Sequence, residues 1–156
     1  MPDPDLKYSR RNNPYICSPH SEVTGLVDIL YKDFEDWYRK VEDKSIKPSK
    51  VDDVKKHLNN IVLDLYAAWY TDPKLFVGYS RGAKYFRKGT SYYNWYLKKD
   101  NLSKIFFPAC IDFLGDNGYA DNRTKTAGYP GRSSRVRAEE KLITLLKNKG
   151  ITWRNI

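Results

Sequence analysis

Apolar residues recur at helical spacing near the start of the chain. From Ser21 to Asp43 they are separated by steps of three and four residues, a pattern that predicts an amphipathic helix. The apolar stripe consists of Val23, Val27, Leu30, Phe34, Trp37 and Val41. The faces between these positions carry Asp28, Asp33, Glu35 and Asp36. The polar surface of this helix is therefore acidic, which disfavours contact with a polyanion.

A second and more regular stripe follows Pro48. Ser49 is suited to cap a helix, and Asp52 lies three residues further on, which is a variant of the capping box. The predicted helix ends near Thr71. Its apolar stripe consists of Val51, Val54, Leu58, Ile61, Leu65 and Trp69. Because only residues 44–48 link the two helices, we expect them to pack as an antiparallel hairpin.

The middle of the chain carries weaker signals. Residues 75–79 are suited to a short strand, and residues 80–90 form a basic stretch interrupted by glycines. For residues 92–99 the periodicity does not separate a strand from a helix. No internal repeat is visible.

The next helix is expected between Ser103 and Gly118, where apolar residues dominate and the glycine is a natural stop. Pro108 lies within this segment, and an interior proline costs roughly 3 kcal/mol. Two alternatives follow. Either the helix kinks at Pro108, or it begins at Phe107 with the proline in its first turn.

Two extended segments come after this helix, Tyr119–Thr126 and Ser133–Ala138. The residues between them are rich in turn formers, so the pair predicts a β-hairpin with polar, basic strands. A last helix is expected from Ala138 to about Lys149, where Gly150 stops it.

The whole pattern predicts an α+β fold that is mostly helical. We divide the 156 residues into a flexible arm over 1–20, a helix with its link over 21–48 and a domain over 49–156. The two cysteines, Cys17 and Cys110, make no disulfide framework. No signal peptide is visible, and no apolar run approaches the roughly 20 residues that span a membrane. We therefore expect a cytoplasmic protein without membrane contact.

Positive charge is concentrated in one part of the chain, whose formal net charge is +9. Residues 74–137 hold 13 basic and 4 acidic residues, while the rest holds 15 of each sign. One segment thus carries the whole imbalance. Uneven charge of this kind is typical of a face that binds a polyanion, although a solubilising surface is the other interpretation.

The segment 113–119 and the basic hairpin after it resemble a winged-helix domain, in which a recognition helix ends in a leucine, a glycine and an aliphatic or aromatic residue. Here these are Leu114, Gly118 and Tyr119. The second strand of the wing in that family often carries arginine or serine, and the segment 133–138 has Ser133, Ser134, Arg135 and Arg137. The resemblance covers about residues 50–146. It implies a winged helix-turn-helix with a β-hairpin wing, fed by the N-terminal helical hairpin.

The stretch Gly78-Tyr79-Ser80-Arg81 is also faintly similar to replication-type proteins of phages, plasmids and bacteria. Charge and resemblance together favour a nucleic-acid-binding protein of replication or regulatory type, with duplex DNA first and single strands second. We expect contacts to run through phosphates more than through bases. The predicted binding residues are Arg81, Lys84, Arg87, Lys88, Lys98, Lys99, Lys104, Arg123, Lys125, Arg132, Arg135 and Arg137.

Enzymatic chemistry has little support in the sequence, and no cofactor or metal is expected. Cys17 and His20 have a short ligand spacing, and His57 and Cys110 would complete four zinc ligands, but a convincing zinc site shows two tight pairs. As a general base His57 is disfavoured, because its charged neighbours suggest a solvated or capping role. No glycine-rich phosphate loop is present.

Three alternatives to the main hypothesis stay open. The aspartates near the basic segment would suit a metal-dependent nuclease, although solubilising charge is commoner. They are Asp112, Asp116 and Asp121. The acidic helix over 21–43 would suit a protein-interaction module or a homodimer contact. Tyrosines interleaved with cations over 79–99 would suit stacking on single strands, although core tyrosines with lysines outside explain the same pattern.

Overall fold

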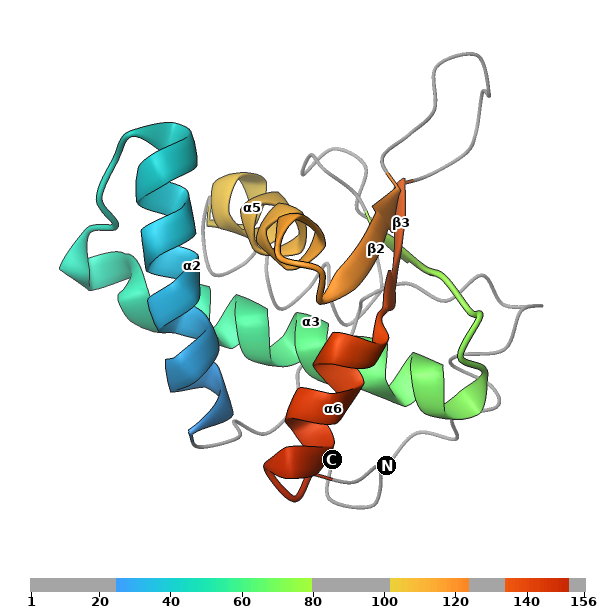
Figure 1. Ribbon diagram of the computed structural model, residues 1–156. Coiled ribbons are helices and arrows are strands. Elements are labelled where there is room, and N and C mark those ends of the chain that lie inside the picture. The colour runs from blue at the N-terminus through green and yellow to red at the C-terminus, as the bar shows by residue number, and fades with distance from the viewer. Residues whose placement is uncertain (1–24, 80–101, 124–133, 152–156) are drawn as a thin grey trace, which may run out of the picture.

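The computed structural model describes residues 25–79, 102–123 and 134–151 (Figure 1). The arm over 1–20 and the segments 80–90 and 92–99 lie outside these residues. The predicted α+β class is confirmed, because the described residues combine four α-helices with one small antiparallel sheet. In chain order the elements are α2, η2, α3, β1, α5, β2, β3 and α6.

The first predicted helix is α2, Leu26–Glu42. Gly25 precedes it with a φ of 89°, a conformation that glycine adopts without strain. The buried line runs in four-residue steps through Leu26, Leu30, Phe34 and Tyr38. Steps of four rotate slowly around a helix, so the line has turned away from Val41 in the last turn. Val41 is 56% exposed, and its assignment to the apolar stripe was wrong.

The second predicted helix is α3, Val51–Thr71, and its predicted end is confirmed. Its start differs from the prediction. Pro48–Lys50 forms a 3₁₀ turn, η2, and α3 follows without a side-chain cap, so Ser49 does not cap it. The proline ring fixes φ at the first position of the turn and thus starts the helical path earlier.

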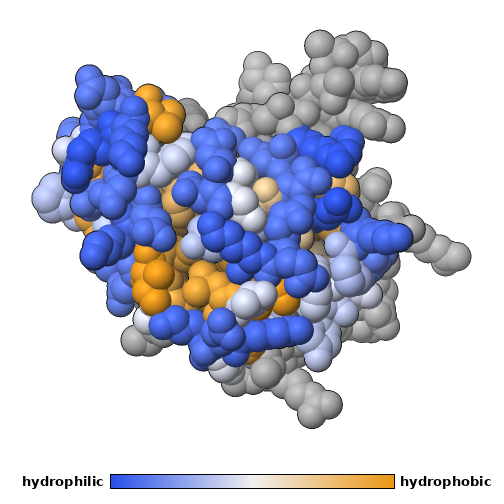
Figure 2. Space-filling model, in the orientation of Figure 1, coloured by the Kyte–Doolittle hydropathy of each residue, from blue (hydrophilic) through white to orange (hydrophobic). Residues whose placement is uncertain are grey.

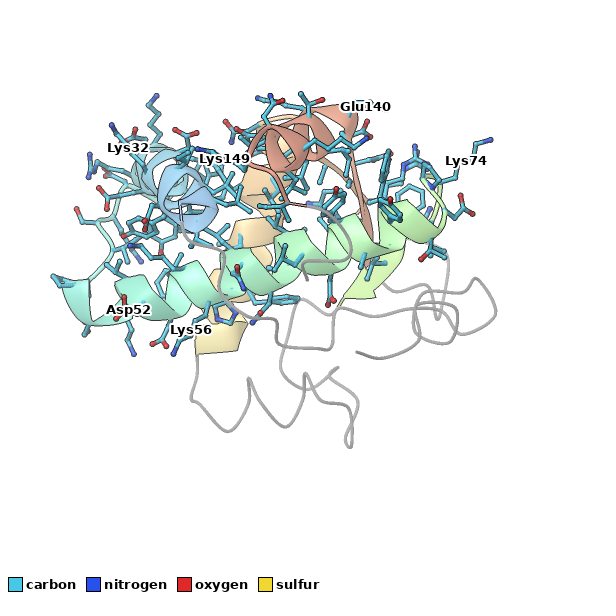
Figure 3. The ribbon with its side chains drawn as sticks, turned by 90° about the horizontal axis from the view of Figure 1, so that it is seen from below. Lys32, Asp52, Lys56, Lys74, Glu140 and Lys149 are labelled. Carbon is cyan, nitrogen blue, oxygen red and sulfur yellow. The ribbon has the colours of Figure 1, made fainter. Side chains whose placement is uncertain are left out.

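Helices α2 and α3 pack together but do not form the expected antiparallel hairpin. They cross steeply: α2 runs up the view of Figure 1 while α3 runs across it, and Figure 3 shows α2 end-on beside the length of α3. The reason is that α2 also packs on α5. Phe34 meets the ring of Phe113 edge-on at 5.5 Å between centroids, and Trp37 Nε1 donates to Asp116 Oδ2 at 2.9 Å.

Helix α5, Leu102–Asp116, contains Pro108 in its interior. Of the two alternatives for this proline, a start at Phe107 is therefore wrong, because the helix begins five residues earlier. Burial compensates for the missing backbone hydrogen bond of the proline, since most apolar side chains of α5 are removed from water. The fully buried ones are Phe107, Cys110, Ile111, Phe113 and Leu114.

The sheet is three-stranded and antiparallel, in the order β1-β3-β2. Its strands are β1, Val77–Tyr79, β2, Ala120–Arg123, and β3, Ser134–Ala138. The predicted hairpin is confirmed by the pairing of β2 with β3, and the predicted short strand is β1, which pairs with the other edge of β3. The buried face of the sheet carries Val77, Ala120, Val136 and Ala138.

Helix α6, Glu140–Asn148, confirms the last predicted helix but begins two residues later, because β3 continues to Ala138. It buries Leu142, Ile143 and Leu146. After it, the Tyr66 hydroxyl of α3 donates to the carbonyl of Ile151 at 3.0 Å. In the described part of the chain, no helix has both the length and the apolar character that crossing a membrane requires.

We expect the substitution Leu65→Ala to lower the free energy of unfolding by about 2–5 kcal/mol, because Leu65 is fully buried in α3 and its loss leaves a cavity. Urea denaturation measures the effect. The matched control is Val41→Ala at the exposed end of α2, which should change stability by no more than about 0.5 kcal/mol. Equal effects of the two substitutions would contradict the assignment of the core.

Candidate nucleic-acid interface

The structure describes the side chains of three predicted binding residues, Arg123, Arg135 and Arg137. Lys104 lies in the first turn of α5, where the structure describes the helical backbone but not this side chain. The others lie outside the described residues, namely Arg81, Lys84, Arg87, Lys88, Lys98, Lys99, Lys125 and Arg132.

Sheet register brings these three arginines to one face. Arg123 of β2 lies directly opposite Arg135 of β3, and Arg137 lies opposite Asp121. Val136, between the two arginines of β3, is fully buried on the other face. Successive side chains of a strand point to opposite faces, so Arg135 and Arg137 point away from the core. We call the side chains of Arg123, Arg135, Arg137, Asp121 and Phe76 the outer sheet cluster.

Phe76 lies at the centre of this cluster. The guanidinium carbons of Arg137, Arg123 and Arg135 are 4.6, 5.0 and 5.4 Å from the centroid of its ring. A guanidinium group within about 6 Å of an aromatic centroid is attracted by the ring's electron density. From the sequence, Phe76 was predicted only as an apolar residue of a short strand, and its contact with the arginines was not predicted.

Asp121 supplies the negative charge of the cluster. Its Oδ2 pairs with Nη2 of Arg123 at 3.3 Å and with Nη2 of Arg137 at 3.4 Å. This aspartate is therefore shared by two of the three arginines. The side chains of Arg123 and Arg137 are 51% and 29% exposed, so both pairs are open to solvent screening.

Three guanidinium groups face one carboxylate, which leaves a local surplus of two positive charges. Arginine carries this surplus on its guanidinium group. Its planar donors match the oxygens of a phosphate. The outer sheet cluster therefore has the chemistry of an anion site on a rigid strand pair.

Helix α5 contributes packing, not cations, over its described side chains. Asn122 Nδ2 of β2 donates to Asp112 Oδ1 at 3.0 Å, and Asp116 accepts from Trp37. A Cβ at Gly115 would lie 2.9 Å from the Cβ of Asn122, so glycine is needed where the helix meets β2. Asp121 pairs with Arg123 and Arg137. The three aspartates of the nuclease alternative thus contact different residues, since Asp112 accepts from Asn122 and Asp116 from Trp37.

His57 is buried in α3, so the expected solvated or capping role was wrong. Its ring lies 6.2 Å from that of Phe107, and burial lowers its pKa from 6.5 to about 3. Burial also raises the pKa of the Cys110 thiol well above its usual value. Among the side chains that the structure describes, no three acidic, histidine or cysteine groups gather as metal ligands, and Cys17 and His20 lie outside them.

Comparison of the chain with models of protein families, with curated proteins and with solved structures finds no match.

The depressed pKa of His57 predicts acid sensitivity. Between pH 6.5 and about 3 the histidine is protonated in the unfolded chain but neutral in the folded one. In this window the free energy of unfolding should therefore fall by about 1.4 kcal/mol for each pH unit of acidification. Above pH 6.5, His57 is neutral in both states and should add no pH dependence to the stability. The variant His57→Gln should flatten this slope in urea titrations, whereas an unchanged slope would show that His57 is accessible to protons.

Proposed function

We propose that this chain binds nucleic acid, with duplex DNA as the favoured ligand, through phosphate contacts from the outer sheet cluster. The observation that carries the proposal is the convergence of Arg123, Arg135 and Arg137 on one face with a single carboxylate among them. A rigid strand pair that presents several cations fits a regular row of phosphates. Phosphates carry no base identity, so the proposed binding is largely independent of sequence.

We further propose that α3 to β3 form a winged helix of replication or regulatory type. The sheet order β1-β3-β2 supports this, since the strand that precedes the proposed recognition helix pairs with the second strand of the wing. Helix α5 lies directly before β2, where a recognition helix stands in that fold. Lys104 is the single basic residue of α5, whereas the outer sheet cluster presents three arginines, which favours the sheet over the helix as the main phosphate-contacting surface.

A second candidate is a protein-interaction module that uses α2, either with another protein or as a homodimer. It is favoured by Ile29 of α2, which is 40% exposed, and by Val41. Figure 2 shows apolar surface on this side of the molecule, between the positions that α2 and α6 occupy in Figure 1. Association through such a surface would depend weakly on salt, whereas binding to DNA phosphates depends on it steeply.

The double variant Arg135→Ala/Arg137→Ala should weaken binding to duplexes of different sequence to the same extent. Each lost phosphate contact should lower the log–log salt slope by about 0.9 in magnitude. Fluorescence anisotropy with two unrelated duplexes, at several salt concentrations, measures both quantities.

The control for this double variant is Lys32→Ala/Lys40→Ala, which removes the same charge from exposed positions of α2. Helix α2, with Lys32, lies at the opposite side of the molecule from the sheet (Figures 1 and 3). If both double variants bind alike, the arginines make no specific contribution. Absence of salt-dependent duplex binding by the wild type would favour the second candidate.

The variant Asp121→Asn should tighten duplex binding by about two- to fivefold, which is the range expected when a screened ion pair no longer competes for the guanidinium groups. Asparagine keeps the size of the side chain, and Asp121→Glu keeps its charge and serves as the control. The same anisotropy titration measures the change. Weaker binding by Asp121→Asn would mean that the carboxylate helps to hold the site and does not compete with the ligand.

A further inference from the structure

The position of Phe76 is not explained by the core. In the chain it stands between Leu75 and Val77, both of which are buried. Side chains alternate between the faces of a strand, so with Val77 directed inward, Phe76 is directed toward the outer face. Val77 pairs with Val136, which places the residue before Val77 beside Arg137. The half-buried ring of Phe76 thus belongs to the face that carries the arginines.

We propose that Phe76 is a positioning residue of the phosphate site: its ring gathers the three guanidinium groups into one preorganised cluster. This inference rests on the proposed function, and it identifies Phe76 as the residue that holds the three cations together for phosphate binding. Asp121 pairs with Arg123 and Arg137, while Phe76 contacts these two and Arg135 as well. The ring is therefore the common partner of all three cations.

The physical reason lies in the repulsion between like charges. Three guanidinium groups within 5.4 Å of one centroid repel one another, and a single carboxylate does not neutralise them. The electron-rich ring attracts each cation without adding charge, and it limits the freedom of three long side chains. Less conformational freedom is then lost when a phosphate arrives, so the affinity is higher at the same net charge.

The same arrangement bears on the class of ligand. The guanidinium groups lie over the Phe76 ring. A nucleobase that stacked on this ring would have to displace them. The cluster therefore fits backbone phosphates and not unpaired bases, which separates it from the alternating rings and cations of a single-strand binder.

The test compares Phe76→Leu, Phe76→Tyr and Arg137→Ala with the wild-type chain in a titration of a fluorescent duplex at several salt concentrations. Leucine keeps the apolar character without the ring, and tyrosine keeps the ring. We expect Phe76→Leu to weaken binding about tenfold, the result of having to order three free side chains. Its salt slope should match the wild type, because the charge is unchanged, whereas Arg137→Ala should lower the slope. Phe76→Tyr should restore wild-type affinity.

Several results would overturn the proposal. Wild-type affinity in Phe76→Leu would show that the ring organises nothing, and loss of affinity in Phe76→Tyr would show that shape and not aromatic character matters. A wild-type chain that does not bind duplexes at low salt would overturn the proposed function itself. If Phe76→Leu does not fold, the proton shifts of the arginine side chains decide: ring-current displacement at all three in the free wild type supports the cluster, and random-coil values overturn it.

Discussion

Val136 lies in the central strand, opposite Val77 on one side and Asn122 on the other, with its side chain fully buried. A slip of one residue in this register would move every side chain of β3 to the other face of the sheet. Arg135 and Arg137 would then enter the core, and the outer sheet cluster would not exist. The anion site thus depends on the apolar match between β3 and the helices behind it, since burial of Val136 determines where the arginines point.

Helix α3 provides the surface on which that match is made. Val54 and residues 57–68 are buried, so water reaches little of the helix over most of its length. Four of these residues are polar, and none of them lacks a partner; they are His57, Asn59, Asn60 and Asp64. Buried polar groups of this kind disfavour alternative packings, because any shift of the helix would break their interactions. The sheet is therefore held against a helix with one well-defined position.

The sequence allowed the local parts of this arrangement to be predicted. Long stripes indicated α2 and α3, and the period of two along a strand placed Arg135 and Arg137 on one face. The pairing of β1 with β3 could not be predicted, because Val77 and Val136 are far apart in the chain and a three-residue strand has no periodicity. Without that pairing, Phe76 could not be connected with arginines of two other strands. The charged neighbours of His57 suggested that it lies on a solvent-exposed face of its helix. Lys55 instead forms an ion pair with Asp28 of α2 where the two helices meet, so charged neighbours did not indicate exposure here.

The contact between Gly115 and Asn122 has a consequence for how the chain can change during evolution. At Gly115 any other residue adds a Cβ that meets the Cβ of Asn122, so a substitution there is tolerated only if β2 moves or position 122 also becomes glycine. The neighbours of Asn122 along β2 are Asp121 and Arg123, both in the outer sheet cluster, so a moving strand would carry them with it. A substitution inside α5 would thereby displace residues on the charged face of the sheet, so changes on the two surfaces are physically coupled.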